Sequence, residues 1–506
     1  MAWNFSSASL ATAIAIIFLT LLWKMVNYLL SKSNIPSPKG DWFIIGHLFE
    51  IRKSKDIIET IDNWARTCGP IFQCRTLGIF GKTVYVVSDI EAVKQVLVSK
   101  SYKYGKPGSL PAIPFLPTKS LVFANGKEHV RMKKMIKPIF NVSNLKSMPK
   151  IFEEKANLLA EYWVDTINGT SKSNKESRLP VESDLSRLTL DALGKSVFGC
   201  NINSIENDDT SEIRAFTDLL DGINPSVNTL MGRLLSYFPF LQWHTESLEK
   251  RRKAMEIITK LVKQTIAGKL EKKIDQSTAQ KNLLDLLLEA VDDETGEGMD
   301  EEELFSQVFL FLLAGYGTSA TTLSWILFFL AQYPEVQEKL RQEVEVTLNE
   351  KEECWETYDS MKYLTSVINE SQRLCPVSPL FRRVVLREDK ILGHNIPAGS
   401  LVLVPVFSLH RKPEYWSDPE TFNPERFLEP NRQDNPNHRY AFIPFSSGPR
   451  SCIAYRFALM EMKIVLSILI RKFSFSMIPG MSFKGSMFGI YKPTPNLELL
   501  VRKIVE

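Results

Sequence analysis

The sequence lacks the marks of several protein classes. Its six cysteines are widely spread and form no C-x-x-C pair, which favours a reducing compartment with free thiols. The net charge of +4 is too small to suggest nucleic-acid binding. There is no internal repeat and no substantial low-complexity tract. What is present is a globular composition, 44% hydrophobic and 24% charged, with ample material for a deep core in 506 residues.

The N-terminal segment lacks charge. No charged side chain occurs in the first 23 residues, and Leu10 to Leu30 is apolar apart from Lys24, Asn27 and two threonines. A run of this length can span or nearly span a bilayer, with Lys24 reaching towards the interface. The alternative is a cleaved signal peptide, which would export the chain, but no convincing A-x-A cleavage site follows the run. We therefore expect a membrane anchor over residues 1–32.

Positive charges after the apolar run orient it. Lys24, Lys32 and Lys39 all lie on its downstream side, so the positive-inside rule places the body of the chain in the cytosol. Residues 33–40 contain the sequence IPSPKG and are expected to form a stiff proline hinge. The remaining residues, 41–506, are expected to form a single domain.

The regular βαβ order of a parallel sheet is also missing from the body of the chain. Residues 41–100 mix strand-like runs with short helices, and residues 380–407 again resemble short strands. From about 125 to 350 the apolar pattern is mainly helical, interrupted by polar loops. Residues 415–450 are rich in Pro, Asn and Asp and are expected to form an ordered meander. The pattern predicts a mainly α fold with a minor β lobe.

The most informative segment is the decapeptide FSSGPRSCIA, from Phe445 to Ala454. It places Cys452 after a turn-forming Ser-Ser-Gly-Pro stretch and just before a long helical run. A thiolate at a helix N-terminus is stabilised by the helix dipole and by free backbone N–H groups. A strongly donating axial ligand to a heme iron needs such an environment. The alternative is a buried cysteine that acts as a small hydrophobic residue.

Other residues of this loop suit the same task. Gly448 permits torsions that let the loop fold tightly around the sulfur. Phe445 can keep water from the thiolate, Arg450 can bind a propionate in bidentate fashion, and Ala454 is small enough for close approach to the ring. The pattern F-x-x-G-x-R-x-C-x-[GA] resembles the heme-binding loop of the cytochrome P450 family. The resemblance implies heme b (iron protoporphyrin IX) as cofactor, Cys452 as the axial iron ligand and the cytochrome P450 fold.

Two further elements resemble the same family. Glu370 and Arg373 stand at i and i+3 on one predicted helix face, a spacing that alone indicates only a surface pair. The tetrapeptide PERF, residues 424–427, follows some fifty residues later. The two elements resemble the ExxR and PERF motifs of the family. The resemblance implies that Glu370, Arg373 and Arg426 form a buried charged triad with a structural role behind the heme.

The apolar run from Leu304 to Leu330 contains the sequence AGYGTS. It resembles the family's oxygen-binding helix, A-G-x-[DE]-T, which implies that Ala314 and Thr318 line the site and that the Thr318 hydroxyl relays protons to iron-bound oxygen. The two glycines are expected to loosen the helix. Gly317 stands where an acid is usual, so Ser319 or water is expected to replace the acid. The alternative reading is a glycine-interrupted core helix.

Further candidate ligands for the heme propionates lie outside the cysteine loop. Residues 125–134 resemble the family's W-x-x-x-R helix, with His129 in place of the Trp and Lys133 in place of the Arg. Both can still donate to a propionate. Arg383 matches another propionate-binding position, although its neighbour Arg382 is an alternative. The basic residues of the predicted helix at 125–134, with the nearby Lys137, could also bind an acidic redox partner. The alternative is an ordinary solvated helix face. These residues are Arg131, Lys133, Lys134 and Lys137.

The resemblance covers nearly the whole chain and implies a microsomal heme-thiolate monooxygenase. Such an enzyme is a single-pass protein of the endoplasmic reticulum membrane with a cytosolic catalytic domain. It inserts one oxygen atom from O2 into a C–H or C=C bond of a lipophilic small molecule. Electrons come from NADPH through NADPH-cytochrome P450 reductase, with cytochrome b5 as a further donor, and no nucleic acid is involved. Substrate contacts are expected from Tyr102–Leu116, Ala314, Thr318, Val377–Leu380 and the Met487–Phe488 turn.

Two other functions remain open. A heme-thiolate isomerase or dehydratase would act on a peroxide without O2 or reductase, and Gly317 favours it. A non-catalytic heme-binding protein is the second alternative. Thr318 argues against both, because neither needs an oxygen-activating hydroxyl.

Overall fold

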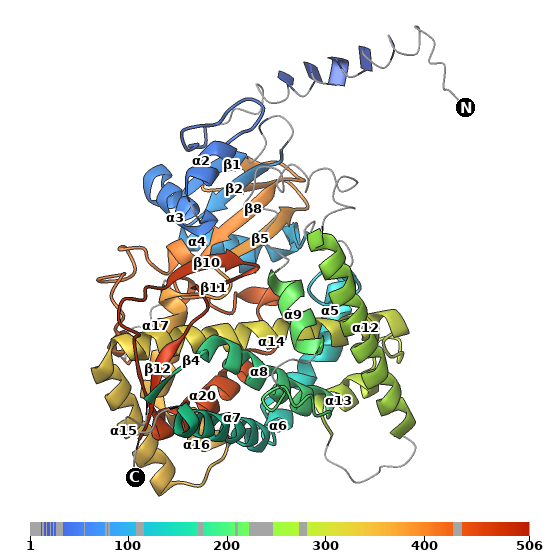
Figure 1. Ribbon diagram of the computed structural model, residues 1–506. Coiled ribbons are helices and arrows are strands. Elements are labelled where there is room, and N and C mark those ends of the chain that lie inside the picture. Colours follow the sequence, from blue (N-terminus) through green and yellow to red (C-terminus); the bar gives the residue numbers. More distant parts are fainter. Residues whose placement is uncertain are drawn as a thin grey trace.

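The computed structural model describes residues 34–54, 56–75, 78, 81–107, 116–170, 176–207, 211–221, 246–272, 281–428 and 438–504, with scattered residues between 12 and 26 (Figure 1). Helices dominate these residues and the sheets are small, so the expected mainly α fold with a minor β lobe is confirmed. The expected helical stretch from 125 to 350 and the short strands within 380–407 are also present.

The β lobe is assembled from two distant parts of the chain. Its five-stranded sheet has the order β1-β2-β8-β5-β3, and β2 runs parallel to β8 while the other pairs are antiparallel. The strands are β1 (Ile71–Arg75), β2 (Thr83–Val87), β3 (Tyr104–Gly105), β5 (Leu380–Val385) and β8 (Leu401–Pro405). In Figure 1, α2 (Leu48–Lys53) and α3 (Ile57–Cys68) lie beside this sheet. Trp64 of α3 packs edge-on against Phe72 of β1, with ring centroids 6.4 Å apart.

Smaller sheets complete the fold. The C-terminal strands join β4 in the order β4-β12-β9, while β10 pairs with β11 and β6 with β7. Their bounds are β4 (Glu176–Leu179), β6 (Asp389–Ile391), β7 (His394–Ile396), β9 (Phe473–Ser476), β10 (Lys484–Phe488), β11 (Ile490–Thr494) and β12 (Leu499–Lys503). The expected turn at Met487–Phe488 is wrong by a residue or two, because both belong to β10 and the chain reverses at Gly489, which has a φ of 74°.

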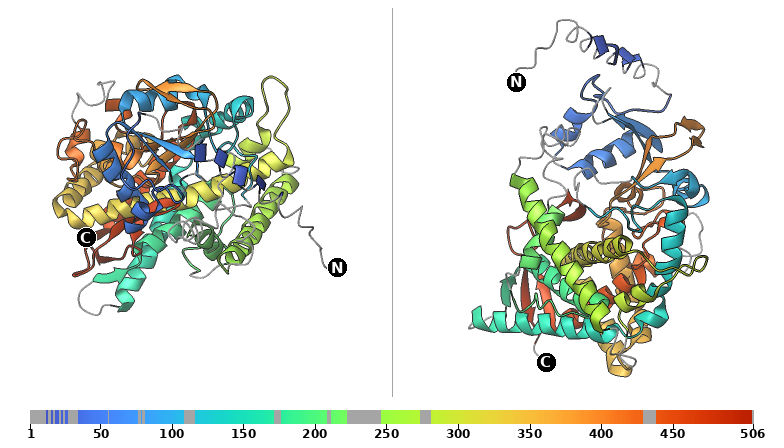
Figure 2. Two further views of the ribbon diagram at one scale, coloured as in Figure 1. Left: turned by 90° about the horizontal axis from the view of Figure 1, so that it is seen from above. Right: turned by 90° about the vertical axis from the view of Figure 1, so that its right-hand side faces the viewer.

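The helical body surrounds one long helix. Its remaining helices are α4 (Ile90–Lys94), α5 (Gly126–Ile136), α6 (Val142–Leu145), α7 (Pro149–Thr170), α8 (Val181–Leu193), α9 (Ser211–Asp221), α12 (Glu246–Lys272), α13 (Leu283–Glu289), α14 (Glu301–Gln332), α15 (Pro334–Glu350), α16 (Trp355–Ser360), α17 (Lys362–Leu374), α18 (Val406–Leu409) and α20 (Tyr455–Lys472). Helix α14 crosses the molecule (Figure 2). A capping box of Asp300 and Glu303 starts it, and Pro334 starts the next helix directly after it.

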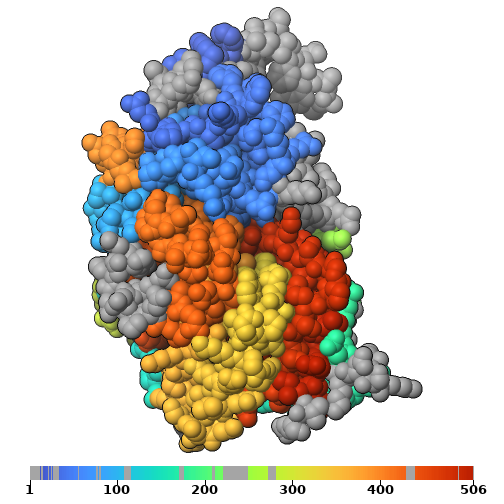
Figure 3. Space-filling view, turned by 90° about the vertical axis from the view of Figure 1, so that its left-hand side faces the viewer, coloured from blue at the N-terminus to red at the C-terminus, as the bar shows by residue number. Residues whose placement is uncertain are grey.

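Segments from both halves of the chain share one surface. In Figure 3 the blue N-terminal part of the β lobe lies against orange segments, and yellow and red segments continue below them. The expected meander consists of short 3-10 turns, including η7 (Pro424–Phe427) and η9 (Gly448–Arg450); residues 429–437 lie outside the described part. The meander therefore joins the β lobe to the loop that carries Cys452.

The expected anchor, residues 1–32, lies mostly outside the described residues. Those that are described are helical, and their large apolar side chains are exposed, including Phe18 at 64% and Trp23 at 64%. The described part contains one helix that is long and apolar enough to span a membrane, α14, but 67% of its most apolar window is buried. Helix α14 is therefore the core helix of the body, and a transmembrane anchor is not seen.

Candidate active site

The loop that carries Cys452 is closed by its own backbone. The Cys452 N–H donates to the Phe445 carbonyl oxygen at 2.8 Å, and α20 begins three residues later, with Ala454 at its N-cap. Gly448 has a φ of 72°, and a Cβ at this position would lie 2.2 Å from the Leu97 carbonyl oxygen. A larger residue would therefore clash with the backbone of the preceding lobe. The loop can exist in this form only with glycine there.

One backbone donor, the N–H of Ala454, acts on the Cys452 sulfur. Cys452 is exposed, yet the protein atoms packed around its thiol raise the pKa, and the Ala454 N–H opposes that rise. The Phe445 ring is half-buried and lies beside Tyr455, with ring centroids 6.3 Å apart. The loop thus presents one thiol, flanked by an aromatic ring, at the start of a helix.

Helix α14 has a less buried face midway along its length. Most of its side chains are buried, yet Ala314 is exposed and Thr318 is half-buried, one turn apart on the same face. The Thr318 hydroxyl donates to the Ala314 carbonyl oxygen at 2.8 Å. The expected loosening of the helix is not seen, since α14 runs unbroken from Glu301 to Gln332. Gly315 has a different effect: a Cβ there would lie 2.3 Å from Leu193 Cδ1, so glycine allows α8 to pack closely.

Ser319 does not lie on this less buried face. Its side chain is only 4% exposed, on a different side of the helix from Thr318. The structure therefore separates two residues that the sequence placed together, because adjacent helix positions point about 100° apart.

A group of basic side chains converges between the cysteine loop, α5 and the β lobe. Arg383 is 2% exposed and His129 is 6% exposed. Burial and the neighbouring charges of Arg450, Lys133 and Lys106 lower the pKa of His129 to about 4. Burial and three arginines, including Arg383 and Arg450, lower the pKa of Lys106 to about 7. His129 is therefore a neutral N–H donor at pH 7, rather than a cation.

These basic residues have no carboxylate partner among the residues that the structure describes. Arg450 donates instead to the Ala124 carbonyl oxygen at 2.6 Å and to Asn125 Oδ1 at 3.0 Å. Lys133 donates to the Pro449 carbonyl oxygen of the cysteine loop. Buried cations without an anion are costly, and a ligand with two carboxylates would offset that cost. The donor set therefore fits the two propionates of a heme.

The structure distinguishes the two adjacent arginines of β5. Arg383 is buried while Arg382 is exposed, because neighbouring strand residues face opposite sides of the sheet. Burial, and after it the charge of Arg450, lower the pKa of Arg383 to about 10. The charge of Arg382 also acts on Lys106, so both arginines lie near the basic group. Lys106, in the segment after β3, was expected only as part of the substrate-contact segment Tyr102–Leu116 and not among the propionate ligands. No motif marks it, and only the fold brings it beside His129.

The basic helix face is less open than expected. Arg131 pairs with Glu303 and Lys134 pairs with Glu294 at 3.0 Å, so both charges are met by acids of the α13–α14 region. Lys137 is exposed. The first expected substrate-contact segment is described only in part, since residues 108–115 lie outside the described residues.

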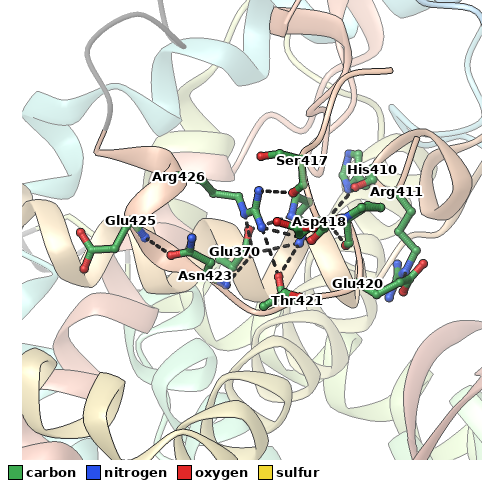
Figure 4. A network of polar contacts seen from close by, with 12 residues as sticks. Glu370, His410, Arg411, Ser417, Asp418, Glu420, Thr421, Asn423, Glu425 and Arg426 are labelled. Atoms are coloured by element: carbon green, nitrogen blue, oxygen red, sulfur yellow. Dashed lines mark hydrogen bonds and ion pairs between the residues drawn. The ribbon is translucent and has the colours of Figure 1, made fainter. Parts of the chain in front are cut away.

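The three charges of the expected triad meet in the structure (Figure 4). Arg373 donates to both Glu370 oxygens, at 2.7 and 2.8 Å, and Arg426 Nε donates to Oε1 at 2.9 Å. The Asn423 N–H adds a fourth hydrogen bond at 2.9 Å. Glu370 and Arg373 are both fully buried. The remaining guanidinium N–H groups donate to carbonyl oxygens of the meander at His410, Ser417, Asp418, Pro419 and Thr421.

Comparison with known proteins agrees with these motifs. The family model described as Cytochrome P450 matches residues 36–501. Cytochrome P450 3A16 of Mus musculus is 30% identical over 493 residues, which cover 93% of this chain and 92% of the relative. Cytochrome P450 3A7 of Homo sapiens is 30% identical over 479 residues, covering 92% and 90%. Cytochrome P450 3A15 of Cavia porcellus is 32% identical over 406 residues, covering 78% and 76%.

Proposed function

Because the chain belongs to the cytochrome P450 family and is a cytochrome P450 monooxygenase, we propose that it inserts one oxygen atom from O2 into a C–H or C=C bond of a lipophilic small molecule. NADPH would supply the electrons through NADPH-cytochrome P450 reductase, with cytochrome b5 as a further donor. One observation carries the proposal: α20, which follows the cysteine loop, packs against α14, which carries Thr318 on its less buried face.

We propose heme b as the cofactor. Cys452 would ligate the iron, Phe445 would shield the sulfur, and His129, Lys133, Arg383 and Arg450 would hold the propionates. Lys106 joins this group on the strength of its place in the structure. The heme, when bound, supplies the chemistry of O2 activation. The protein must orient the substrate, exclude water and deliver protons.

We propose that the Thr318 hydroxyl relays those protons. Its hydroxyl donates to the Ala314 carbonyl oxygen, so the hydroxyl oxygen can accept a proton from a water that reaches this face. It can then pass on its own hydrogen by rotating about χ1. Ala314, whose side chain is a single methyl group, is exposed beside it.

The test is Thr318→Ala. We expect product formed per NADPH to fall roughly tenfold or more, because a positioned proton donor contributes on the order of 10²-fold to a rate. NADPH consumption should continue, with the lost product replaced by hydrogen peroxide. Thr322→Ala is the matched control, since the Thr322 hydroxyl makes the same bond one turn later, to the Thr318 carbonyl oxygen at 2.8 Å. Turnover of a peroxide without NADPH or reductase would instead favour the isomerase or dehydratase, to which Gly317 is suited.

We also propose that the protein is a single-pass protein of the endoplasmic reticulum membrane, anchored by residues 1–32 with its catalytic domain in the cytosol. The exposed apolar residues of the first segment support this proposal, and Trp42 and Ile44, exposed by 57% and 58%, continue the apolar surface beyond the hinge. Deletion of residues 1–32 should release the protein from vesicles into the soluble fraction after an alkaline wash. Complete retention of the shortened chain would contradict the anchor.

A further inference from the structure

Asn125 stands at the start of α5, yet its side chain does not cap that helix. It is the N-cap residue, with a φ of −130° and a ψ of 162°, and it makes no side-chain capping bond. Asparagine is preferred at an N-cap because its side-chain oxygen can accept from the N–H of the second or third helical residue. Here the amide bonds to other parts of the chain instead. A capping role therefore does not account for this side chain.

The Asn125 amide uses all of its hydrogen-bonding positions on the segments around it. Its Oδ1 accepts from the Lys106 N–H at 2.9 Å and from Arg450 Nη2 at 3.0 Å. Its Nδ2 donates to the Lys106 carbonyl oxygen at 3.2 Å and to the Phe123 carbonyl oxygen at 3.1 Å. An amide has two acceptor positions and two N–H donors, so none is left over. One neutral side chain thus joins the cysteine loop to the backbone of Lys106.

The close approach of Asn125 to the β lobe depends on the residue before Lys106. Gly105 ends β3, which pairs with β5, the strand that carries Arg383. A Cβ on Gly105 would lie 3.0 Å from Asn125 Oδ1, which is closer than a Cβ normally comes to another atom. Glycine therefore leaves room for the amide. The amide meets Lys106 where the backbone is already fixed by the strand pair.

We propose that Asn125 is the positioning residue of the propionate site, which holds Arg450 and Lys106 in place and thereby sets how firmly the protein retains heme and the reduction potential of the iron. The proposal rests on the proposed heme cofactor and adds to it a residue that acts through its two cationic partners. A neutral amide can join these residues without offsetting their charge. A carboxylate at the same place would compete with the propionates for Arg450.

The charge of the two cations gives the direction of the effect. Reduction of the heme iron adds one electron, and nearby positive charge favours the more negative form of a cofactor. Hydrogen bonds and charges around a heme are among the means by which a protein sets its potential. Firmly held Arg450 and Lys106 therefore raise the reduction potential, and their displacement lowers it.

Heme retention tests the first consequence. Heme should pass from full-length Asn125→Asp to an excess of apomyoglobin on the order of tenfold faster than from the wild type, since outer partners of a metal site are worth roughly 10–100-fold in affinity. Aspartate has the same shape and keeps both acceptor bonds, but it loses both donors and adds a negative charge. A transfer rate equal to that of the wild type would overturn the proposal.

Asn144→Asp is the matched control for this measurement. Asn144 is a half-buried asparagine of α6, and its Nδ2 donates to the Pro138 carbonyl oxygen at 3.0 Å. The substitution makes the same chemical change away from Arg450 and Lys106, so heme transfer should keep the wild-type rate. An equal acceleration in both variants would show a general effect of the added charge and would also overturn the proposal.

The reduction potential separates positioning from packing. Asn125→Asp should shift the potential to a more negative value, and Asn125→Ala should shift it in the same direction by less, because alanine frees the cations without adding a charge. Packing alone predicts the reverse order, since aspartate preserves the shape of the side chain and alanine does not. The reverse order, or unchanged potentials, would overturn the proposal.

A second variant covers the case in which the Asn125 variants do not fold. Gly105→Ala presses on the Asn125 amide without removing it, so heme transfer should again be faster and the potential more negative. Wild-type values for both would contradict the proposal. A wild type without a heme-thiolate spectrum would instead remove the proposed cofactor itself, which keeps the two failures distinguishable.

Discussion

Cys452→Ala is expected to abolish the absorption band of the reduced, CO-bound protein that marks thiolate ligation of heme. The Cys452 N–H closes the loop onto Phe445, and its thiol lies beside the N–H of Ala454 at the start of α20. Alanine keeps that backbone arrangement and removes only the sulfur, so the fold should persist. Monooxygenase activity should vanish with the band, because electron donation by the thiolate is what favours cleavage of the O–O bond.

The control must remove a thiol without touching the site. Cys68→Ala meets this need, because Cys68 is half-buried at the end of α3, packs against the small core cluster of the β lobe and lies 3.9 Å from the Thr67 hydroxyl through its sulfur. It should leave the spectrum unchanged. A full thiolate band in Cys452→Ala would contradict the ligand assignment, and a loss of the band in both variants would point to general loss of heme.

Glu370→Gln is expected to lower the free energy of unfolding by about 3–5 kcal/mol, since removing one partner of a buried ion pair leaves uncompensated charge. Two guanidinium groups, Arg373 and Arg426, would then face each other without their common carboxylate. The same two guanidinium groups donate hydrogen bonds to carbonyl oxygens of the meander. Their displacement should therefore also destabilise the cysteine loop, which follows the meander. We expect a lower denaturant midpoint and a smaller fraction of protein that retains heme.

An exposed ion pair on the same meander provides the comparison. Glu425 pairs with Lys339, and the two side chains are 49% and 52% exposed. Glu425→Gln should change the unfolding free energy by less than about 1 kcal/mol, because solvent-exposed pairs contribute little. Equal midpoints for the two variants would show that the triad has no special structural weight.

Sequence patterns worked best where the chemistry is local. The cysteine loop is one such case, because its closure joins residues seven positions apart and needs a positive φ only at Gly448 and Ser446. The spacing of Glu370 and Arg373 is also local. The burial of this charged pair depends on distant parts of the chain, and it was expected only from the family resemblance. The role expected of Gly315 was wrong for a tertiary reason: its missing side chain serves the contact with α8, and helix α14 does not bend there.

The sequence by itself determined the cofactor chemistry and the general fold class, because a ligand loop and an amphipathic pattern depend on neighbours along the chain. Tertiary structure decided which groups share an environment. It brought Lys106 to His129, turned Arg383 inward, and joined Asn125 to Arg450 of the cysteine loop. Burial and the charge of distant neighbours set the protonation of Lys106 and His129, and neither quantity is encoded at any single position.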